Sequence, residues 1–258
     1  MPTFFSISVK FDYIYRNYYI KYYGCVFLKL QDFKNKSRII LALDFPDYKF
    51  SMSLLNSIQD FISGVKIGLP FLLGVGINKV KKLISAFSKK LFFIADLKLA
   101  DVSHVESLVI ESLKEMKFSG IIAHAFTGIS GSLEESTKRA KELNIQVFLV
   151  VAMSHIGAEE ILNRNFDHLL KITIKVDADG CIAPATNPTY IKRAREYLGE
   201  DYLILSPGIG AQGAPPGMAL KNGADFEIIG RMIIKSTDPI NVVRDILKKQ
   251  KDALKIGE

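Results

Sequence analysis

The chain has 258 residues, of which 48% are hydrophobic and 24% charged, and this is enough to bury a substantial core within one domain. Its net charge of +7 is uneven, because residues 1–37 hold six Lys or Arg against two Asp and leave only +3 for the remainder. That remainder has no basic cluster interleaved with aromatic residues, which argues against a nucleic-acid partner. Cys25 and Cys181 lie far apart without metal-ligand spacing, so neither a disulfide framework nor a zinc site is indicated, and a cytoplasmic location fits best.

Residues 1–37 form an unusual N-terminal extension that holds 11 of the 27 aromatic residues. Lys10, Asp12, Arg16 and Lys21 interrupt every apolar run before it reaches about 18 residues, which argues against a membrane span or a signal peptide. Three interpretations remain: an added hairpin or amphipathic segment, a partner-binding arm, or a start codon assigned too far upstream. Every motif described below begins at Leu41 or later, so the sequence predicts that residues 1–36 are dispensable for activity.

From residue 38 to residue 258, short apolar runs rich in β-formers alternate with longer segments of helical periodicity. The predicted strands are Ile39–Leu43, Gly64–Ile67, Leu91–Ala95, Gly120–Ala123, Gln146–Val151, Gly180–Ala183, Tyr202–Leu205 and Phe226–Ile229. The helical segments include Pro70–Lys89, Ser103–Lys117, Ser132–Leu143, Ala158–Lys171, Pro188–Leu198 and Asp238–Leu254, whereas Ile172–Val176 fits either a helix or a strand. Eight such units in about 220 residues predict an α/β fold, a (β/α)₈ TIM barrel.

The third predicted strand ends in three charges of alternating sign, in the motif Asp96-Leu-Lys98-Leu-Ala-Asp101. Residues two apart on a strand share a face, so the side chains of Asp96 and Lys98 are expected to point the same way, with Asp101 in the loop. The carboxyl ends of barrel strands carry the active site in enzymes of this architecture. The motif is short and weakly specific, and its position after a strand is what indicates a catalytic role.

Other chemically useful side chains also lie at or just after the ends of predicted strands, except for Lys66, which lies within the second predicted strand. They are Asp44, Lys66, His124, Ser154 with His155, the segment Pro207–Gly213, and Gly230 with Arg231. Because the carboxyl ends of parallel strands meet at one end of a barrel, these residues are expected to surround one site. His124 and His155 are better explained by packing or loop support than by contact with a substrate.

The segment Gly208-Ile-Gly-Ala-Gln-Gly213 matches the G-x-G-x-x-G pattern of dinucleotide-binding folds. That pattern requires a helix that opens on the glycines, but Pro215 and Pro216 follow directly and too little chain remains for such a fold. A phosphate site is the better interpretation, because barrels commonly bind phosphate after strands seven and eight. Gln212 offers an amide there and Arg231 a guanidinium. The alternative is a glycine-rich turn with a surface arginine.

Six motifs in this order resemble the orotidine 5′-monophosphate decarboxylase family over residues 38–258. They are Leu41-Ala-Leu-Asp44, Val65-Lys66-Ile-Gly68, Asp96-Leu-Lys98-Leu-Ala-Asp101, Met153-Ser154-His155, Ser206-Pro-Gly-Ile-Gly-Ala-Gln212-Gly213 and Ile229-Gly-Arg231. The short loops are similar to those of the archaeal and other microbial members. The resemblance implies the conversion of orotidine 5′-monophosphate (OMP) to UMP in pyrimidine biosynthesis, without a metal or an organic cofactor.

The resemblance also implies residue roles. Lys98 would stabilise the negative charge that develops at C6 of the pyrimidine and protonate that carbon, and Asp96 would lie beside the departing carboxylate. Asp44 and Lys66 would bind the ribose hydroxyls, with Lys66 also holding the charge network. Ser154 would bond the pyrimidine amide. The remaining substrate-binding residues are Pro207 and the phosphate-binding Gln212, Gly230 and Arg231.

The family forms homodimers in which the residue that matches Asp101 reaches into the neighbouring subunit's site. The same arrangement is implied here, except that many relatives carry a Thr where this chain has Val105. Two alternatives remain. The Mg²⁺-dependent sugar-phosphate branch of the superfamily shares D-x-K-x-x-D but has a Glu at the position of Lys66 and lacks the glycine loop. A non-catalytic barrel that binds a phosphate ligand would be expected to lack Asp96, Lys98 or Asp101, and all three are present.

Overall fold

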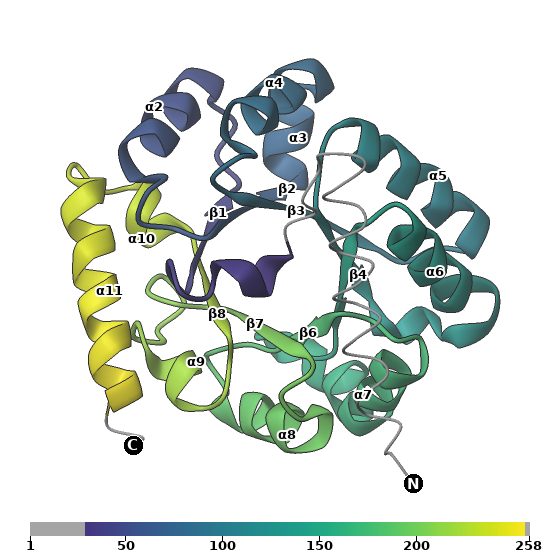
Figure 1. Cartoon of the computed structure of the whole chain (residues 1–258). Coiled ribbons are helices and arrows are strands. Elements are labelled where there is room, and N and C mark those ends of the chain that lie inside the picture. The colour runs from purple at the N-terminus through teal and green to yellow at the C-terminus, as the bar shows by residue number, and fades with distance from the viewer. Residues whose placement is uncertain (1–28, 256–258) are drawn as a thin grey trace, which may run out of the picture.

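The computed structural model describes residues 29–255, in which eight parallel strands close into a barrel with helices around it (Figure 1). The strands are β1 (Ile39–Leu43), β2 (Gly64–Gly68), β3 (Phe92–Leu99), β4 (Gly120–His124), β5 (Gln146–Val150), β6 (Gly180–Ile182), β7 (Leu203–Pro207) and β8 (Phe226–Ile229). They follow one another around the barrel in chain order, and β8 pairs with β1. The predicted (β/α)₈ architecture is confirmed.

Helices cover the outside of this barrel (Figure 1). They are α2 (Tyr48–Ile58), α3 (Leu69–Val75), α4 (Ile77–Phe87), α5 (Ser103–Glu115), α6 (Glu134–Glu142), α7 (Phe166–Lys175), α8 (Pro188–Leu198), α9 (Met218–Lys221), α10 (Arg231–Ile234) and α11 (Pro239–Lys255). Short helical turns lie at η1 (Leu30–Phe33), η2 (Ala125–Thr127), η3 (Ile129–Leu133), η4 (Ile156–Glu160) and η5 (Asn163–Asn165).

The strands are buried on both faces, because their inward side chains fill the barrel and their outward side chains meet the helices. Every residue of β1, β2 and β5 is buried, and several of the longer helices turn an apolar stripe toward the strands. In α4 that stripe is Val80, Leu83, Ile84 and Phe87, with helical spacing. The helical segments therefore pack by the same pattern that identifies them in the sequence.

Two predicted helices differ from those observed. The segment Pro70–Lys89 divides into α3 and α4 at Gly76, whose φ of 84° breaks the right-handed helix. The segment Ala158–Lys171 begins with the turns η4 and η5, and α7 then continues to Lys175. The strand alternative for Ile172–Val176 is therefore wrong, because Ile172 and Thr173 belong to the buried face of α7.

Residues 29–37, which the sequence assigns to the extension, are part of the folded body. The turn η1 lies across one end of the barrel (Figure 1), with Leu30 fully buried and Phe33 8% exposed. The Leu30 N–H donates to Gln146 Oε1 at 2.7 Å, and Ser63 Oγ donates to the Phe33 carbonyl at 3.1 Å. The predicted boundary at residue 37 is thus too late for the packed structure. Residues 1–28 lie outside the described residues, so the nature of the extension stays a prediction.

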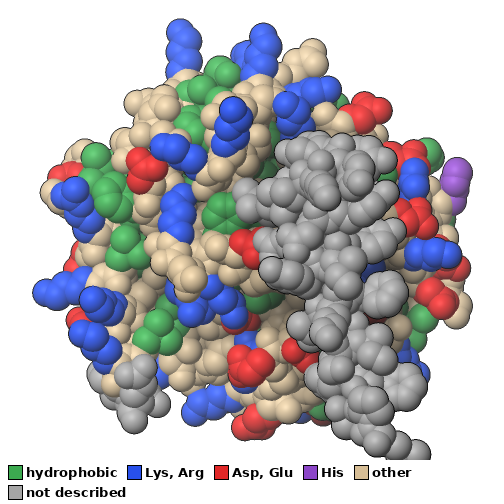
Figure 2. Space-filling view, viewed as in Figure 1, with side chains coloured by type: hydrophobic (Ala, Val, Ile, Leu, Met, Phe, Trp, Pro, Cys, Tyr) green, Lys and Arg blue, Asp and Glu red, His purple; other side chains and the backbone are tan. Residues whose placement is uncertain are grey.

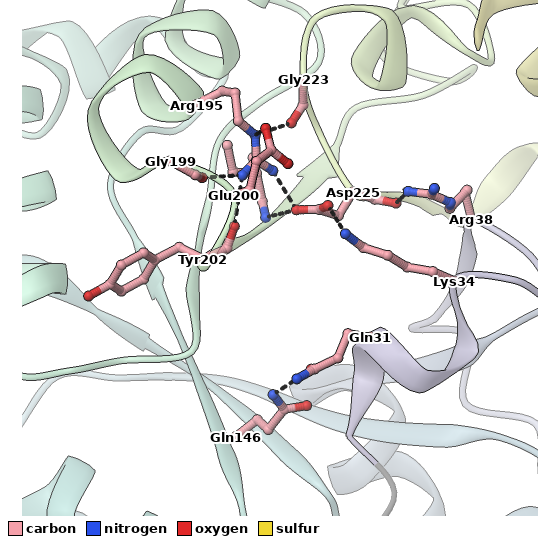
Figure 3. A network of polar contacts seen from close by, with 11 residues as sticks. Gln31, Lys34, Arg38, Gln146, Arg195, Gly199, Glu200, Tyr202, Gly223 and Asp225 are labelled. Carbon is pink, nitrogen blue, oxygen red and sulfur yellow. Dashed lines mark hydrogen bonds and ion pairs between the residues drawn. The ribbon is translucent and has the colours of Figure 1, made fainter. Parts of the chain in front are cut away.

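A network of charged groups joins η1 to the barrel at the same end (Figure 3). Asp225, only 4% exposed, forms an ion pair with Lys34 and another with Arg195 on α8 at 2.6 Å. Arg38 donates to the Asp225 carbonyl at 3.2 Å. The amide of Gln146 donates to Gln31 Oε1 at 3.2 Å. This end of the barrel is therefore held together by polar contacts as well as by the apolar residues of η1.

Figure 2 shows the face that Figure 1 presents, with Lys and Arg side chains scattered over its coloured part and Asp and Glu among them. Within residues 29–255, none of the helices combines the length and the apolar character that crossing a bilayer requires.

Candidate active site

A cavity of about 280 Å³ lies at the carboxyl ends of the strands. Nine of the residues that the sequence predicts for the site line it: Asp44, Lys66, Asp96, Lys98, Ser154, Pro207, Gln212, Gly230 and Arg231. Apolar side chains that were not predicted complete the wall, namely Ile122, Val150, Ile182 and Ile228 from β4, β5, β6 and β8. Their signal in the sequence is their place at or near the ends of buried strands. The cavity therefore combines a charged side with an apolar side.

Four of these side chains form a row of alternating charge. Lys66 Nζ lies 3.1 Å from Asp44 Oδ1 and 2.9 Å from Asp96 Oδ2. Lys98 Nζ lies 2.8 Å from Asp96 Oδ1. Each inner member of the row thus has an opposite charge on both sides, while the Lys98 side chain, 41% exposed, ends the row at the cavity.

The two inner members are almost fully buried, and their neighbours keep both of them charged. Burial opposes the charged form of Lys66, but the carboxylates of Asp96 and Asp44 outweigh it and raise the pKa of Lys66. Burial likewise opposes ionisation of Asp96, but Lys66 and Lys98 outweigh it and lower the pKa of Asp96. The row therefore presents a fixed negative charge beside a cation.

Lys98 has an unusual backbone, with a φ of 47° in the left-handed region. The register between β3 and β4 shifts between Asp96 and Leu99, as in a β-bulge. Asp96 and Lys98 both line the cavity, as expected. The expectation assumed a regular strand, however, and the structure has a shift of register between Asp96 and Leu99. The bulge turns Lys98 so that its ammonium group returns to the Asp96 carboxylate.

Asp101 does not belong to the cavity wall. Its side chain accepts the Val102 N–H at 2.7 Å, its own N–H donates to Glu106 Oε1 at 3.2 Å, and its carbonyl accepts from Ser132 Oγ at 2.8 Å. Asp101 is exposed and Glu106 is 1% exposed, so the loop is fixed while the carboxylate stays at the surface.

The loop after β7 has the backbone that its glycines permit. Gly208, Gly210 and Gly213 have φ values of 108°, 72° and 104°, all in the region that favours glycine. The next helix, α9, begins only at Met218, so the dinucleotide interpretation is wrong. Ser154 Oγ donates to Gln212 Oε1 at 3.0 Å, which joins this loop to the loop after β5.

His124 lies at the end of β4 and packs against Phe126 with ring centroids 4.6 Å apart and ring planes inclined by 37°. Burial and the nearby Lys98 lower its pKa, and its buried Nδ1 has no hydrogen-bond partner within residues 29–255. In the same part of the chain, no group of three or more His, Cys, Asp or Glu side chains is arranged to hold a metal ion.

No motif in the sequence points to Asn163, which lies behind the cavity wall. It is 5% exposed and pairs with both backbone polar groups of Met153, a cavity-lining residue. An asparagine in a segment of helical periodicity is expected on the solvent side, and only the tertiary contact identifies it.

Known proteins are similar to this chain in both sequence and structure. Residues 37–246 match the family described as Orotidine 5′-phosphate decarboxylase / HUMPS family. The orotidine 5′-phosphate decarboxylase of Methanococcoides burtonii is 35% identical over 213 residues, which are 83% of this chain and 97% of the relative. That of Pyrococcus furiosus is 37% identical over 216 residues, 83% and 98% respectively.

Solved structures of the same kind also match. The crystal structure of orotidine 5′-monophosphate decarboxylase from Sulfolobus solfataricus aligns with a TM-score of 0.77 and 32% identity, covering 85% of this chain and all of the other. The enzyme from Methanocaldococcus jannaschii, complexed with inhibitor BMP, aligns with a TM-score of 0.73 and 29% identity, covering 83% and 99%.

Proposed function

The chain belongs to the orotidine 5′-phosphate decarboxylase / HUMPS family, and from this we propose that it decarboxylates OMP to UMP in pyrimidine biosynthesis. The observation that carries the proposal is the row Asp44–Lys66–Asp96–Lys98 at the wall of a cavity that also holds Gln212 and Arg231. A carboxylate between two lysines, opposite a phosphate-binding loop, fits an anionic nucleotide whose reacting carbon becomes negative.

The same row argues against the metal-dependent sugar-phosphate branch. In that branch a Glu stands at the position of Lys66 and helps to bind Mg²⁺. Here an ammonium group occupies the position, paired at 3.1 and 2.9 Å with Asp44 and Asp96. A divalent cation between these two carboxylates would lie against the buried ammonium, which repels it.

In the proposed reaction the bond between C6 of the pyrimidine and its carboxylate breaks, CO₂ leaves, and the electron pair stays on C6. The Lys98 ammonium stabilises this carbanion and donates a proton to it, after which Lys98 takes a proton from water. Opposite unit charges about 4 Å apart attract by roughly 4 kcal/mol at an effective dielectric near 20, and this attraction grows as the charge develops. Asp96 lies beside the substrate carboxylate, so its fixed charge disfavours the bound substrate more than the products.

The remaining cavity residues bind the parts of the nucleotide that do not react. Asp44 and Lys66 bind the ribose hydroxyls, and Ser154 binds the pyrimidine amide. Arg231, the first residue of α10, and Gln212 hold the phosphate together with Gly230. Binding energy from the phosphate can then be used to hold the pyrimidine against Lys98 and Asp96.

We further propose a homodimer in which Asp101 enters the partner's site. Support comes from the surface around Asp101, where Val102 is 57% exposed and Val105 and Leu108 on α5 are 40% and 53% exposed. Three further large apolar side chains are exposed, namely Leu69 and Leu73 on α3 and Phe126 after β4. Val105 and Leu108 are three residues apart on α5 and so share one face, and exposed apolar side chains on one face are typical of surfaces that a partner covers. A cytoplasmic location stays part of the proposal.

The test is the substrate preference of the purified protein. OMP should lose its ultraviolet absorbance at the same rate with and without EDTA, and the product should be UMP. Turnover of a hexulose phosphate that requires Mg²⁺, with none of OMP, would instead assign the chain to the sugar-phosphate branch. No turnover of either compound by the folded protein would favour a ligand-binding role.

A further inference from the structure

A buried amide behind the cavity fixes the backbone that leads into Ser154. The Met153 N–H donates to Asn163 Oδ1 at 3.0 Å, and Asn163 Nδ2 donates to the Met153 carbonyl at 3.1 Å. Strand β5 has already ended at Val150, so no strand of the described part of the chain pairs with these two groups. The Asn163 side chain takes the place of such a strand.

Met153 and Ser154 both line the cavity, and Ser154 Oγ donates to Gln212 Oε1 at 3.0 Å. The backbone at Met153 therefore sets where the Ser154 hydroxyl lies relative to the loop after β7. A displacement of about 1 Å at that point would move the hydroxyl out of hydrogen-bond range.

Asn163 is itself held from behind. Its Nδ2 also donates to Glu159 Oε1 at 2.6 Å, and the Tyr190 hydroxyl lies 3.2 and 3.4 Å from the two Glu159 oxygens. The Tyr190 ring packs on Phe166 with centroids 4.8 Å apart. Burial and the Glu159 carboxylate raise the pKa of Tyr190, so its hydroxyl keeps the proton that it donates. The support thus runs from α8 to the loop after β5.

We propose that Asn163, held by Glu159 and Tyr190, is a positioning residue that places Ser154 for the nucleotide and for its bond with Gln212. The proposal rests on the proposed function, since that function gives Ser154 its contact with the pyrimidine. A merely structural amide would stabilise the loop, but its loss would cost the same whether or not the Ser154 hydroxyl is present. A positioning residue acts through that hydroxyl and loses its effect without it.

The experiment is a double-mutant cycle of Asn163→Ala and Ser154→Ala, read as kcat/KM for OMP and as the affinity for UMP by titration calorimetry. Asn163→Ala alone should lower kcat/KM by about 10- to 100-fold, mainly through a higher KM, with a matching loss of UMP affinity. In the Ser154→Ala background the same change should cost less than about twofold. The matched control is Asn165→Ala, which removes an exposed amide of the same segment. Within residues 29–255 that amide bonds only the Ile161 carbonyl, so the variant should stay within about twofold of wild type.

Equal losses in both backgrounds, or an Asn163→Ala variant that behaves like Asn165→Ala, would overturn the proposal. If Asn163→Ala does not fold, Tyr190→Phe takes its place in the cycle, because it removes only the hydroxyl that reaches Glu159. A loss that disappears in the Ser154→Ala background supports the proposal, and any other pattern overturns it. If the wild type binds UMP without turning over OMP, the proposed function fails while the UMP cycle still decides the role of Asn163. If it does not bind UMP either, both proposals fall.

Discussion

Lys66 connects the binding part of the site to its reactive part. It is 6% exposed and lies between Asp44, which faces the ribose in the proposed reaction, and Asp96, which faces the departing carboxylate. Space at this point is tight, because a β carbon on Gly68 would lie 1.9 Å from Asp44 Oδ1 and 3.3 Å from Lys66 Nζ. The glycine that ends β2 is therefore needed for the row to form.

The row should make stability depend on pH at the acid end. Folding lowers the pKa of Asp96 below its ordinary value of 3.8. The stability that its charge contributes is therefore fully present above about pH 4 and is lost as the pH falls through the lowered pKa. We expect the difference in unfolding free energy between wild type and Asp96→Asn to be constant from about pH 5 to 9 and to shrink below about pH 4. Urea denaturation across this range measures the difference.

The matched control is Asp60→Asn, whose carboxylate pairs with Lys90 at the surface, with both side chains more than half exposed. Its effect on the unfolding free energy should be below about 1 kcal/mol at every pH. A difference for Asp96→Asn that keeps its full size at pH 2 would show that the carboxylate is not stabilised by its two lysines.

At the residue scale, the sequence predicts those site residues whose place depends only on their position along a strand. Asp44 and Arg231 follow strands β1 and β8, Lys66 and Asp96 lie within β2 and β3, and the closure of the barrel brings them together. The bulge at Lys98 and the amide of Asn163 could not be predicted, because each depends on contacts between segments that are distant in sequence. The periodicity of a segment carries no information about such contacts.

Among the elements, η1 differs most from the expectation, because the sequence assigns it to the N-terminal extension and the structure packs it into the barrel. Two of its four residues, Leu30 and Phe33, are buried. The side-chain amide of Gln146 has hydrogen bonds with both η1 and Asp179. Lys36 Nζ donates to the carbonyls of Gln59 and Lys90 at 2.7 and 2.9 Å. Eleven aromatic residues in the first 37 obscure this pattern, since two buried residues in one short turn are not distinguishable from their many apolar neighbours.

Because η1 packs into the barrel, we expect residues 29–36 to be needed for stability, whereas the sequence alone predicts that residues 1–36 are dispensable for activity. Two truncated proteins test this. A chain that begins at Lys29 should keep the activity and the unfolding free energy of the full chain. A chain that begins at Lys36 should lose at least about 3 kcal/mol, because burial of Leu30 and Phe33 contributes about 1.5–3 kcal/mol each. Urea denaturation and OMP turnover of the two proteins provide the comparison.

Leu30→Ala in the full chain separates the role of packing from that of chain length, and it should cost about 2–5 kcal/mol. Equal stability of the Lys29 and Lys36 proteins would mean that η1 contributes nothing to the fold. A loss of activity already in the Lys29 protein would assign a role to residues 1–28.

The other elements show where periodicity is sufficient and where it is not. Strands β1 and β8 have the predicted bounds, because short apolar runs between turn residues leave little freedom. The break at Gly76 and the irregular turns η4 and η5 were not predicted, since a glycine or an asparagine inside a helical pattern is compatible with a continuous helix.

For the whole molecule, the proposed dimer makes a prediction that a monomer cannot satisfy. Lys98→Ala and Asp101→Asn should each be nearly inactive alone, but a mixture refolded together should recover about a quarter of wild-type activity. Half of the dimers would then be mixed, and each mixed dimer would combine one intact Lys98 with the intact Asp101 of its partner. OMP turnover, with size-exclusion chromatography to establish the dimer, measures the recovery.

A mixture that stays inactive although it forms dimers would place Asp101 in the site of its own subunit or outside the reaction. The control is a mixture of Lys98→Ala with Asp96→Asn, two residues of one row, which should remain inactive after the same treatment.

The effect of Lys98→Ala on OMP turnover is the most direct measurement of the proposed reaction. The wild type in D₂O should form UMP that carries deuterium at C6, and Lys98→Ala should lower the rate at least about 1,000-fold with an unchanged circular dichroism spectrum. Lys89→Ala, which removes an exposed lysine outside the cavity, should stay within about twofold of wild type. A folded Lys98→Ala variant that keeps more than about a tenth of the wild-type rate would contradict the assignment of Lys98 as the group that stabilises and protonates C6.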